Sequence, residues 1–148
     1  RYKQLTDIKK YILAENHSVV ADYHIFKNLI FAKRTLKPTE YHKYEEIYRI
    51  LTADMPKPNI VIYLDASVDT LMKRIAMRGR EFEKMISRDY MEQLVEDYHT
   101  FIESFEKSHP DIPVIRVNGD ELDFVQHAAD LQRILRKIDE TLQQRSFK

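Results

Sequence analysis

The sequence predicts an α/β fold built on a parallel sheet. Short β-branched runs alternate with stretches in which apolar residues recur at helical spacing, the order typical of layered folds with crossover helices. The segment Asn59–Leu64 (NIVIYL) is almost entirely apolar, as expected of a strand buried on both faces of a sheet. Only three strands are predicted, which is few for this class.

Length and composition narrow the classes of protein that remain. The 148 residues fit a single domain over 1–148, and 24 Lys and Arg balance 24 Asp and Glu, which argues against a nucleic-acid binder. The absence of Cys excludes disulfides, thiolate zinc sites and a Cys nucleophile. No apolar stretch is long enough to span a membrane, so we expect a soluble cytoplasmic protein with no membrane partner.

The first third of the chain is predicted to hold three helices and one strand. Apolar spacing predicts a helix from Tyr2 to about Asn16, and Ser18–Asp22 (SVVAD) is the first predicted strand. A second helix is predicted from about His24 to Lys33. Pro38 opens a third, with a stripe formed by Tyr41, Tyr44, Tyr48 and Leu51.

After Asn59–Leu64, the predicted elements are bounded by caps and breakers. Ser67 is the predicted N-cap of a helix that runs to Arg78 and stops at Gly79. The charged segment from Arg80 to Ile86 is predicted to be a surface loop. Ser87 caps a long amphipathic helix that Pro110 ends.

The last predicted elements are a strand, a turn and a helix. The third strand is Pro113–Val117 (PVIRV), and the turn Asn118–Asp120 follows it. A final amphipathic helix is marked by apolar residues at helical spacing, namely Phe124, Ala128, Leu131, Leu135, Ile138 and Leu142.

Polar residues follow each predicted strand, and ligands of open α/β sheets bind beyond the strands' carboxyl ends. These residues are Asp22, Asp65 and the turn Asn118–Asp120. Asp65 has two interpretations, because acids near a helix start also stabilise its free N–H groups. Asp22 is equally open to a role as an ordinary turn residue.

An arginine-rich segment lies at the end of the helix that Ser67 caps. Arg74 and Arg78 are four residues apart on one helix face, and Arg80 follows Gly79. Cations are favourable at a helix C-terminus, but guanidinium groups are also suited to clamping phosphates. The six histidines show no ligand-pair spacing with plausible partners, so no zinc site is predicted.

These residues together resemble the deoxynucleoside kinase family, most closely its bacterial deoxyguanosine and deoxyadenosine kinase branch. The resemblance covers nearly the whole chain and is carried by SVVADYHIFKNLIFAKRTL, KPNIVIYLDASVDTLMKRIAMRGREFE and VIRVNGD. It implies a P-loop kinase-like three-layer fold with a parallel sheet and a helical lid at about 78–87. The family begins with a strand, a P-loop and a second strand. With glycine only at positions 79 and 119, this chain is expected to correspond to the last two-thirds of such an enzyme.

The resemblance also implies roles for individual residues. Asp22 would be the carboxylate near the substrate 5′-hydroxyl and the metal, and Tyr23 departs from the family's usual Arg. On the substrate side, Asn28 would face the base, Phe31 would stack on it, and Glu83 would reach the sugar 3′-hydroxyl. The lid arginines would be Arg74, Arg78 and Arg80, and Asn118, Gly119 and Asp120 would form the loop beside the adenine of ATP.

The activity implied is transfer of a phosphoryl group from ATP, with Mg²⁺, to a purine deoxynucleoside in nucleotide salvage, with deoxyguanosine the first choice and deoxyadenosine the next. The family also implies a homodimer. Two alternatives remain open: a thymidylate kinase-like enzyme, which shares an arginine lid, and a non-catalytic module for binding or oligomerisation. The resemblance further places the P-loop strand between Ser18–Asp22 and Asn59–Leu64, so we expect 1–148 alone to be unstable and inactive.

Overall fold

The computed structural model describes residues 18–22 and 24–146. The described chain divides into two compact units, the second of which begins at Pro58, and each unit is described by itself. The single domain expected over 1–148 stays a prediction. The helix expected at residues 2–16 lies outside the described residues.

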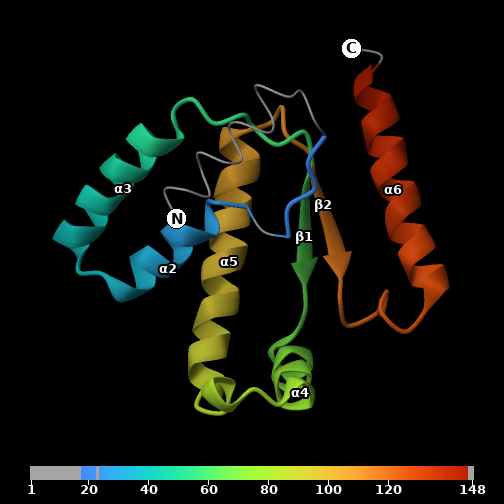
Figure 1. Ribbon diagram of the computed structural model, residues 1–148, viewed down its shortest axis with the longest axis horizontal. Coiled ribbons are helices and arrows are strands. Elements are labelled where there is room, and N and C mark those ends of the chain that lie inside the picture. The colour runs from blue at the N-terminus through green and yellow to red at the C-terminus, as the bar shows by residue number, and fades with distance from the viewer. Residues whose placement is uncertain (1–17, 23, 147–148) are drawn as a thin grey trace. The chain divides into compact units, whose positions relative to one another are not determined.

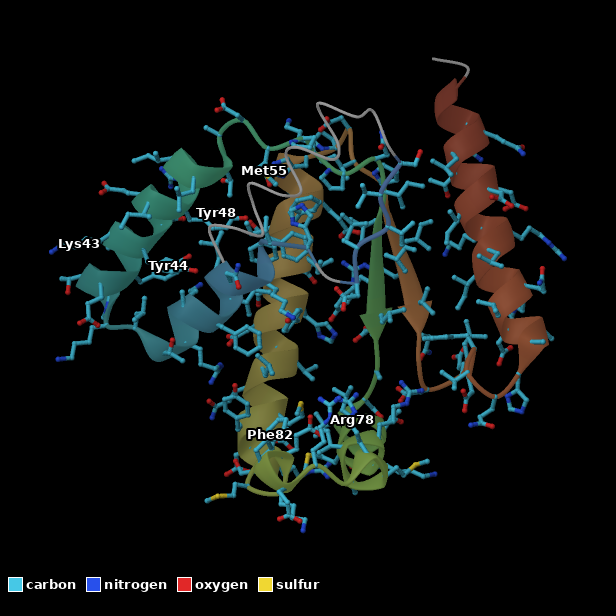
Figure 2. The ribbon with its side chains drawn as sticks, in the orientation of Figure 1. Lys43, Tyr44, Tyr48, Met55, Arg78 and Phe82 are labelled. Atoms are coloured by element: carbon cyan, nitrogen blue, oxygen red, sulfur yellow. The ribbon has the colours of Figure 1, made fainter. Side chains whose placement is uncertain are left out.

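The first unit contains two helices, α2 (Lys27–Thr35) and α3 (Pro38–Thr52). Helix α2 begins later than predicted, because the backbone before it forms a turn. In this turn the Phe26 amide donates to His24 Nδ1 (3.2 Å). Helix α3 begins at Pro38 as predicted, and Glu40 accepts a hydrogen bond from the Lys37 amide (3.0 Å). Tyr44 and Tyr48 point to the inner side of the corner formed by α2 and α3, whereas Lys43 points outward (Figure 2).

The strand predicted at Ser18–Asp22 is wrong. These five residues are exposed and do not form a strand in the structure. A β-strand is stabilised by ladder hydrogen bonds to a neighbour, and the described chain provides no such partner for this segment. The β-branched residues Val19 and Val20 are both exposed.

The second unit holds a parallel two-stranded sheet formed by β1 (Val61–Asp65) and β2 (Val114–Asn118). In the register Val61 pairs with Val114, and Asp65 pairs with Asn118. Both strands were predicted, but each ends one residue later than expected and β1 starts two residues later. The ladder begins where the Val61 amide reaches the Pro113 carbonyl (3.0 Å), and Pro113 itself has no N–H to donate.

Three long helices complete this unit: α4 (Val68–Arg78), α5 (Arg88–Ser108) and α6 (Ala128–Ser146). Helices α5 and α6 lie on either side of the two strands, which gives three layers (Figure 1). On the α6 side, Ile134 packs with Ile115 and Val117. The layered α/β arrangement expected from the sequence is therefore confirmed in this unit.

On the other face of the sheet, polar and aromatic side chains contact α5. The Tyr63 ring lies 6.2 Å from that of His99, and Arg116 Nη2 lies 2.7 Å from Glu106 Oε2. Phe124, predicted to belong to the last helix, precedes it and packs against the α6-side core. There the Asp123 carboxylate accepts hydrogen bonds from the Val125 and Gln126 amides, which forms a turn before α6 begins.

The predicted caps of α4 and α5 are confirmed. Ser67 Oγ accepts from the Thr70 amide (3.3 Å), and Ser87 Oγ accepts from the Tyr90 amide (3.1 Å). Gly79 ends α4 with φ +65°, a conformation that side chains with a Cβ resist. Among the described helices, none is both long and apolar enough to cross a membrane.

Candidate active site

The carboxyl edge of the sheet brings two of the predicted polar segments together. Asp65 and Asn118 are paired at the ends of β1 and β2, and the Gly119 amide donates to the Asp65 carbonyl (2.6 Å). Gly119 is buried, and a Cβ added to it would lie 2.9 Å from the Asp65 carbonyl oxygen. There is therefore no room for a Cβ at position 119, and glycine is required there.

The Asp65 carboxylate lies between two side chains that the sequence did not single out. Its Oδ1 lies 2.9 Å from His99 Nε2 of α5 and accepts a weaker hydrogen bond from the Tyr63 hydroxyl (3.4 Å). Burial and then the nearby Asp65 charge raise the pKa of Tyr63 above its usual range, so this phenol stays protonated. Asp65 thus connects β1 to α5.

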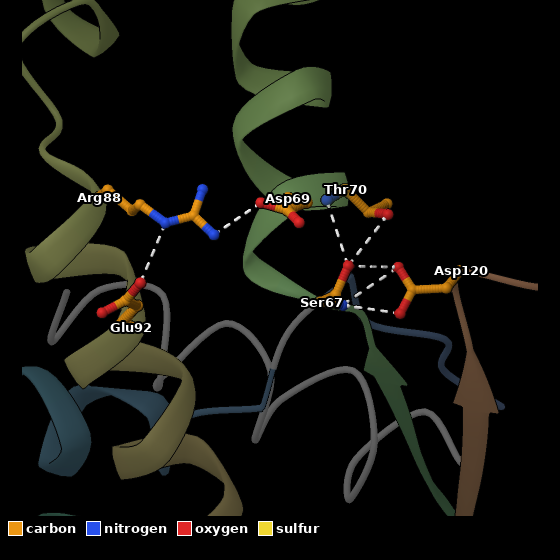
Figure 3. Close-up of polar contacts among 6 residues, drawn as sticks. All are labelled: Ser67, Asp69, Thr70, Arg88, Glu92 and Asp120. Carbon is orange, nitrogen blue, oxygen red and sulfur yellow. Dashed lines mark hydrogen bonds and ion pairs between the residues drawn. The ribbon is translucent and has the colours of Figure 1, made fainter.

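The turn Asn118–Asp120 is held against α4. Arg74 Nη2 donates to the Gly119 carbonyl (2.7 Å), and the Asp120 carboxylate accepts from the Ser67 amide (2.9 and 3.1 Å) and from Ser67 Oγ (2.9 Å) (Figure 3). Hydrogen bonds from the Thr70 side chain, then from Ser67, hold the pKa of Asp120 below its usual value. We call this turn with its contacts the Asp120 loop.

The lid contains the densest group of charges among the predicted site residues. Arg78 Nη1 and Arg80 Nη1 lie 3.3 and 3.5 Å from Glu83 Oε1. The side chains of both arginines are 55% exposed, whereas that of Glu83 is 10% exposed. Within the described residues, the buried Glu83 Oε2 has no hydrogen-bond partner. An unpaired buried carboxylate oxygen is costly, so this atom is available to accept a hydrogen bond from a ligand.

The segment Arg80–Ile86, which its charge pattern predicted as a surface loop, holds one turn of 3₁₀ helix, Glu81–Glu83. This turn contains Glu83, which contacts the two arginines, while Phe82 and Met85 are 76% and 92% exposed. The Arg80 guanidinium lies 6.0 Å from the Phe82 ring centroid. Arg78 and Phe82 both lie at the end of the unit where α4 meets the lid (Figure 2).

The remaining predicted site residues belong to the first unit. Asp22 is exposed, and Asn28 and Phe31 are partly buried on α2. Because these two residues are three apart in one helix, they lie on the same face. Tyr23 lies outside the described residues.

No group of three or more His, Asp or Glu side chains able to hold a metal ion occurs in residues 18–22 and 24–146. Mg²⁺ in kinases needs only one or two carboxylates together with substrate phosphates and water. The exposed carboxylate of Asp22 is compatible with such a role.

A family model and two similar relatives point to the same family. The family model described as deoxynucleoside kinase matches residues 1–143. A deoxyguanosine kinase from Bacillus subtilis (strain 168) is 47% identical over 142 residues, which cover 96% of this chain and 69% of the relative. A deoxyadenosine kinase from Lactobacillus acidophilus is 32% identical over 155 residues, covering 95% of this chain and 69% of the relative.

The fold comparison points the same way. A solved structure of deoxyadenosine kinase from M. mycoides with bound dCTP superposes with a TM-score of 0.69 at 26% identity. The superposed region covers 94% of this chain and 73% of the chain in that structure. The expected P-loop kinase-like fold is thereby confirmed.

Proposed function

The chain belongs to the deoxynucleoside kinase family, and on this basis we propose that it transfers the γ-phosphoryl group of ATP to the 5′-hydroxyl of a purine deoxynucleoside. Deoxyguanosine is the preferred substrate in this proposal and deoxyadenosine the next, because the relative with 47% identity is a deoxyguanosine kinase. The product would enter nucleotide salvage.

The observation that carries the proposal is the convergence of Arg78 and Arg80 on Glu83 in the lid. Phosphoryl transfer depends on positioning and on cationic groups that stabilise charge on the transferring oxygens. A guanidinium has five N–H donors, so an arginine that contacts Glu83 through one nitrogen retains others for phosphate oxygens. The two arginines are assigned this role.

The acceptor side is assigned to Asp22, Tyr23, Asn28, Phe31 and Glu83. Asp22 would orient the 5′-hydroxyl and take its proton as the new O–P bond forms and the bond to ADP breaks. Phe31 offers an aromatic face to the base, and Asn28 offers an amide to its edge. Glu83 Oε2 would accept a hydrogen bond from the 3′-hydroxyl, which would satisfy this buried oxygen.

The donor side is assigned to Arg74 and the Asp120 loop, with the adenine lying beside Asn118–Asp120. Mg²⁺ would be held by the donor phosphates and Asp22, and it would neutralise phosphate charge when bound. The homodimer and the cytoplasmic location implied by the family stay predictions. Light scattering of the complete protein tests the homodimer.

The test is a phosphoryl-transfer assay of the complete protein with labelled ATP and Mg²⁺. We expect kcat/KM to be highest for deoxyguanosine, lower for deoxyadenosine and lowest for the pyrimidine deoxynucleosides. Transfer to thymidine monophosphate or deoxyguanosine monophosphate, and not to a nucleoside, would favour a thymidylate kinase-like enzyme. Absence of any transfer would favour a non-catalytic binding module.

A further inference from the structure

The Ser67 side chain makes two kinds of contact at once. It caps α4 locally by accepting from the Thr70 amide (3.3 Å), and it donates to Asp120 Oδ1 (2.9 Å), 53 residues further along the chain. A hydroxyl has one donor and two acceptor positions, so the contacts do not compete. Figure 3 shows Ser67 between Thr70 and Asp120.

The cap of α5 provides a natural comparison. Ser87 accepts from the Tyr90 amide at 3.1 Å in the same way, and this cap contact stays within its own helix. Ser67 differs because both its amide and its hydroxyl hold one carboxylate from the loop after β2. Helix capping accounts for the contact that Ser87 makes, but it does not account for the contact of Ser67 with Asp120.

Asp120 is exposed, so contacts with α4 rather than burial restrain its side chain. On the buried side of the loop, Arg74 holds the Gly119 carbonyl, and both Arg74 and Ser67 belong to the α4 segment. The loop is thus fixed to the helix whose other end bears Arg78. Loss of the Ser67 hydroxyl would weaken the hold of α4 on Asp120, which keeps the Ser67 amide and the Thr70 side chain as partners, while Gly119 stays held by Arg74.

We propose that Ser67 is a positioning residue for the phosphate donor, which holds Asp120 so that the Asp120 loop is preformed for the donor's base. This inference rests on the proposed function, in which the loop lies beside the adenine. If the loop adopts its binding conformation only a tenth of the time without the Ser67 hydroxyl, the affinity for ATP falls by about tenfold. The proposed function assigns the deoxynucleoside to other residues, so we expect its binding to stay unchanged.

Three substitutions of Ser67 in the complete protein separate this role from capping. Ser67→Ala removes both contacts of the hydroxyl, the cap and the hydrogen bond to Asp120, and keeps the amide contact with Asp120. Ser67→Asp retains a strong N-cap but brings a second carboxylate against Asp120, and like charges repel. Ser67→Thr retains both the cap and the hydroxyl donor. Each variant is assayed with ATP and deoxyguanosine, and its thermal midpoint is recorded.

We expect Ser67→Ala and Ser67→Asp to raise the KM for ATP by about tenfold, with the KM for deoxyguanosine and kcat at saturating ATP within about twofold of wild type. Ser67→Thr should restore the KM for ATP. Ser67→Asp should keep a thermal midpoint near that of wild type, so its defect cannot be attributed to unfolding.

Several outcomes overturn the inference. A wild-type KM for ATP in Ser67→Asp, with a raised value only in Ser67→Ala, would mean that Ser67 acts as a helix cap alone. An unchanged KM for ATP in both variants, or an equal rise in both KM values, would equally refute it. In each of these cases the wild type still phosphorylates deoxyguanosine. Failure of the wild type to do so would instead refute the proposed function, and the role of Ser67 with it.

Discussion

The two oxygens of Glu83 have different surroundings. Oε1 lies near both lid arginines, whereas Oε2 is buried with no partner in the described part of the chain. Such an atom is destabilising unless a ligand pairs with it, because its lost hydration is not replaced. Within one side chain, Oε1 therefore holds the arginines and Oε2 is the oxygen that would bind substrate.

Glu83→Gln tests the second function. The neutral amide has nearly the same shape but loses a charge-assisted hydrogen bond of about 1.5–3 kcal/mol to the 3′-hydroxyl. We therefore expect the ratio of kcat/KM for deoxyguanosine over its 3′-deoxy analogue to fall by about tenfold or more. Glu81→Gln, two residues away and exposed, is the control that should leave this ratio unchanged. The same ratio in Glu83→Gln and wild type would show that Glu83 only holds the arginines.

Arg78→Ala tests the lid as a source of cationic donors. Loss of a donor that acts on developing charge should lower kcat by about 100-fold or more, with little change in deoxynucleoside binding. Arg88→Ala is the matched control: it removes the same charge from a half-exposed arginine that pairs with Asp69 and Glu92. A variant at position 78 that kept kcat and lost only thermal stability would identify Arg78 as a helix-end cation.

At the scale of the element, α4 joins a loop contact at its start to the lid at its end. Ser67 and Gly79 mark its two limits, and both were predicted because capping depends on residue types close together in the chain. The cap at Ser87 was predicted for the same reason. The strand expected at Ser18–Asp22 was wrong because a strand also requires a distant neighbour, which composition does not reveal.

In the candidate site, too, contacts between residues close in the chain were predictable and contacts between distant residues were not. Arg78, Arg80 and Glu83 lie within six positions, so their grouping in the lid was predictable from the sequence. The contacts of Asp65 with His99 and of Ser67 with Asp120 span 34 and 53 residues. No local pattern marks them, since they depend on how β1, β2 and α5 pack.

Gly79→Ala tests the junction between α4 and the lid. An alanine in the left-handed conformation at φ +65° costs about 1–2 kcal/mol, and the surrounding space is open, so backbone strain is the only penalty. We expect a lower free energy of unfolding in a urea titration. Gly79→Asn should lose less, because asparagine tolerates this conformation. Equal losses in the two variants would contradict the strain argument.

At the scale of the whole molecule, the described sheet has only two strands, so each strand has one edge without a ladder partner in the described residues. Ile62 and Leu64 of β1 are also exposed. Two-stranded sheets are marginal in water, and exposed apolar strands with open edges promote association.

We therefore predict that the 148 residues expressed on their own aggregate and transfer no phosphoryl group. Size-exclusion chromatography and calorimetry of the 148 residues check the predicted aggregation. Leu64→Thr should reduce the aggregated fraction, whereas Val125→Thr, at another exposed apolar position, should not. A monomer with a cooperative thermal transition would contradict this prediction.

The exposed methionines beside the lid also make it visible to spectroscopy. The sequence has five methionines; Met77 and Met85 flank the lid arginines and are highly exposed, whereas Met91, at the start of α5, is buried. A protein labelled with ¹³C at the methionine methyl groups would give a spectrum simple enough to assign by substitution. Shifts of the Met77 and Met85 signals on addition of ATP, against a constant Met91 signal, would show in solution that ATP changes the surroundings of the lid.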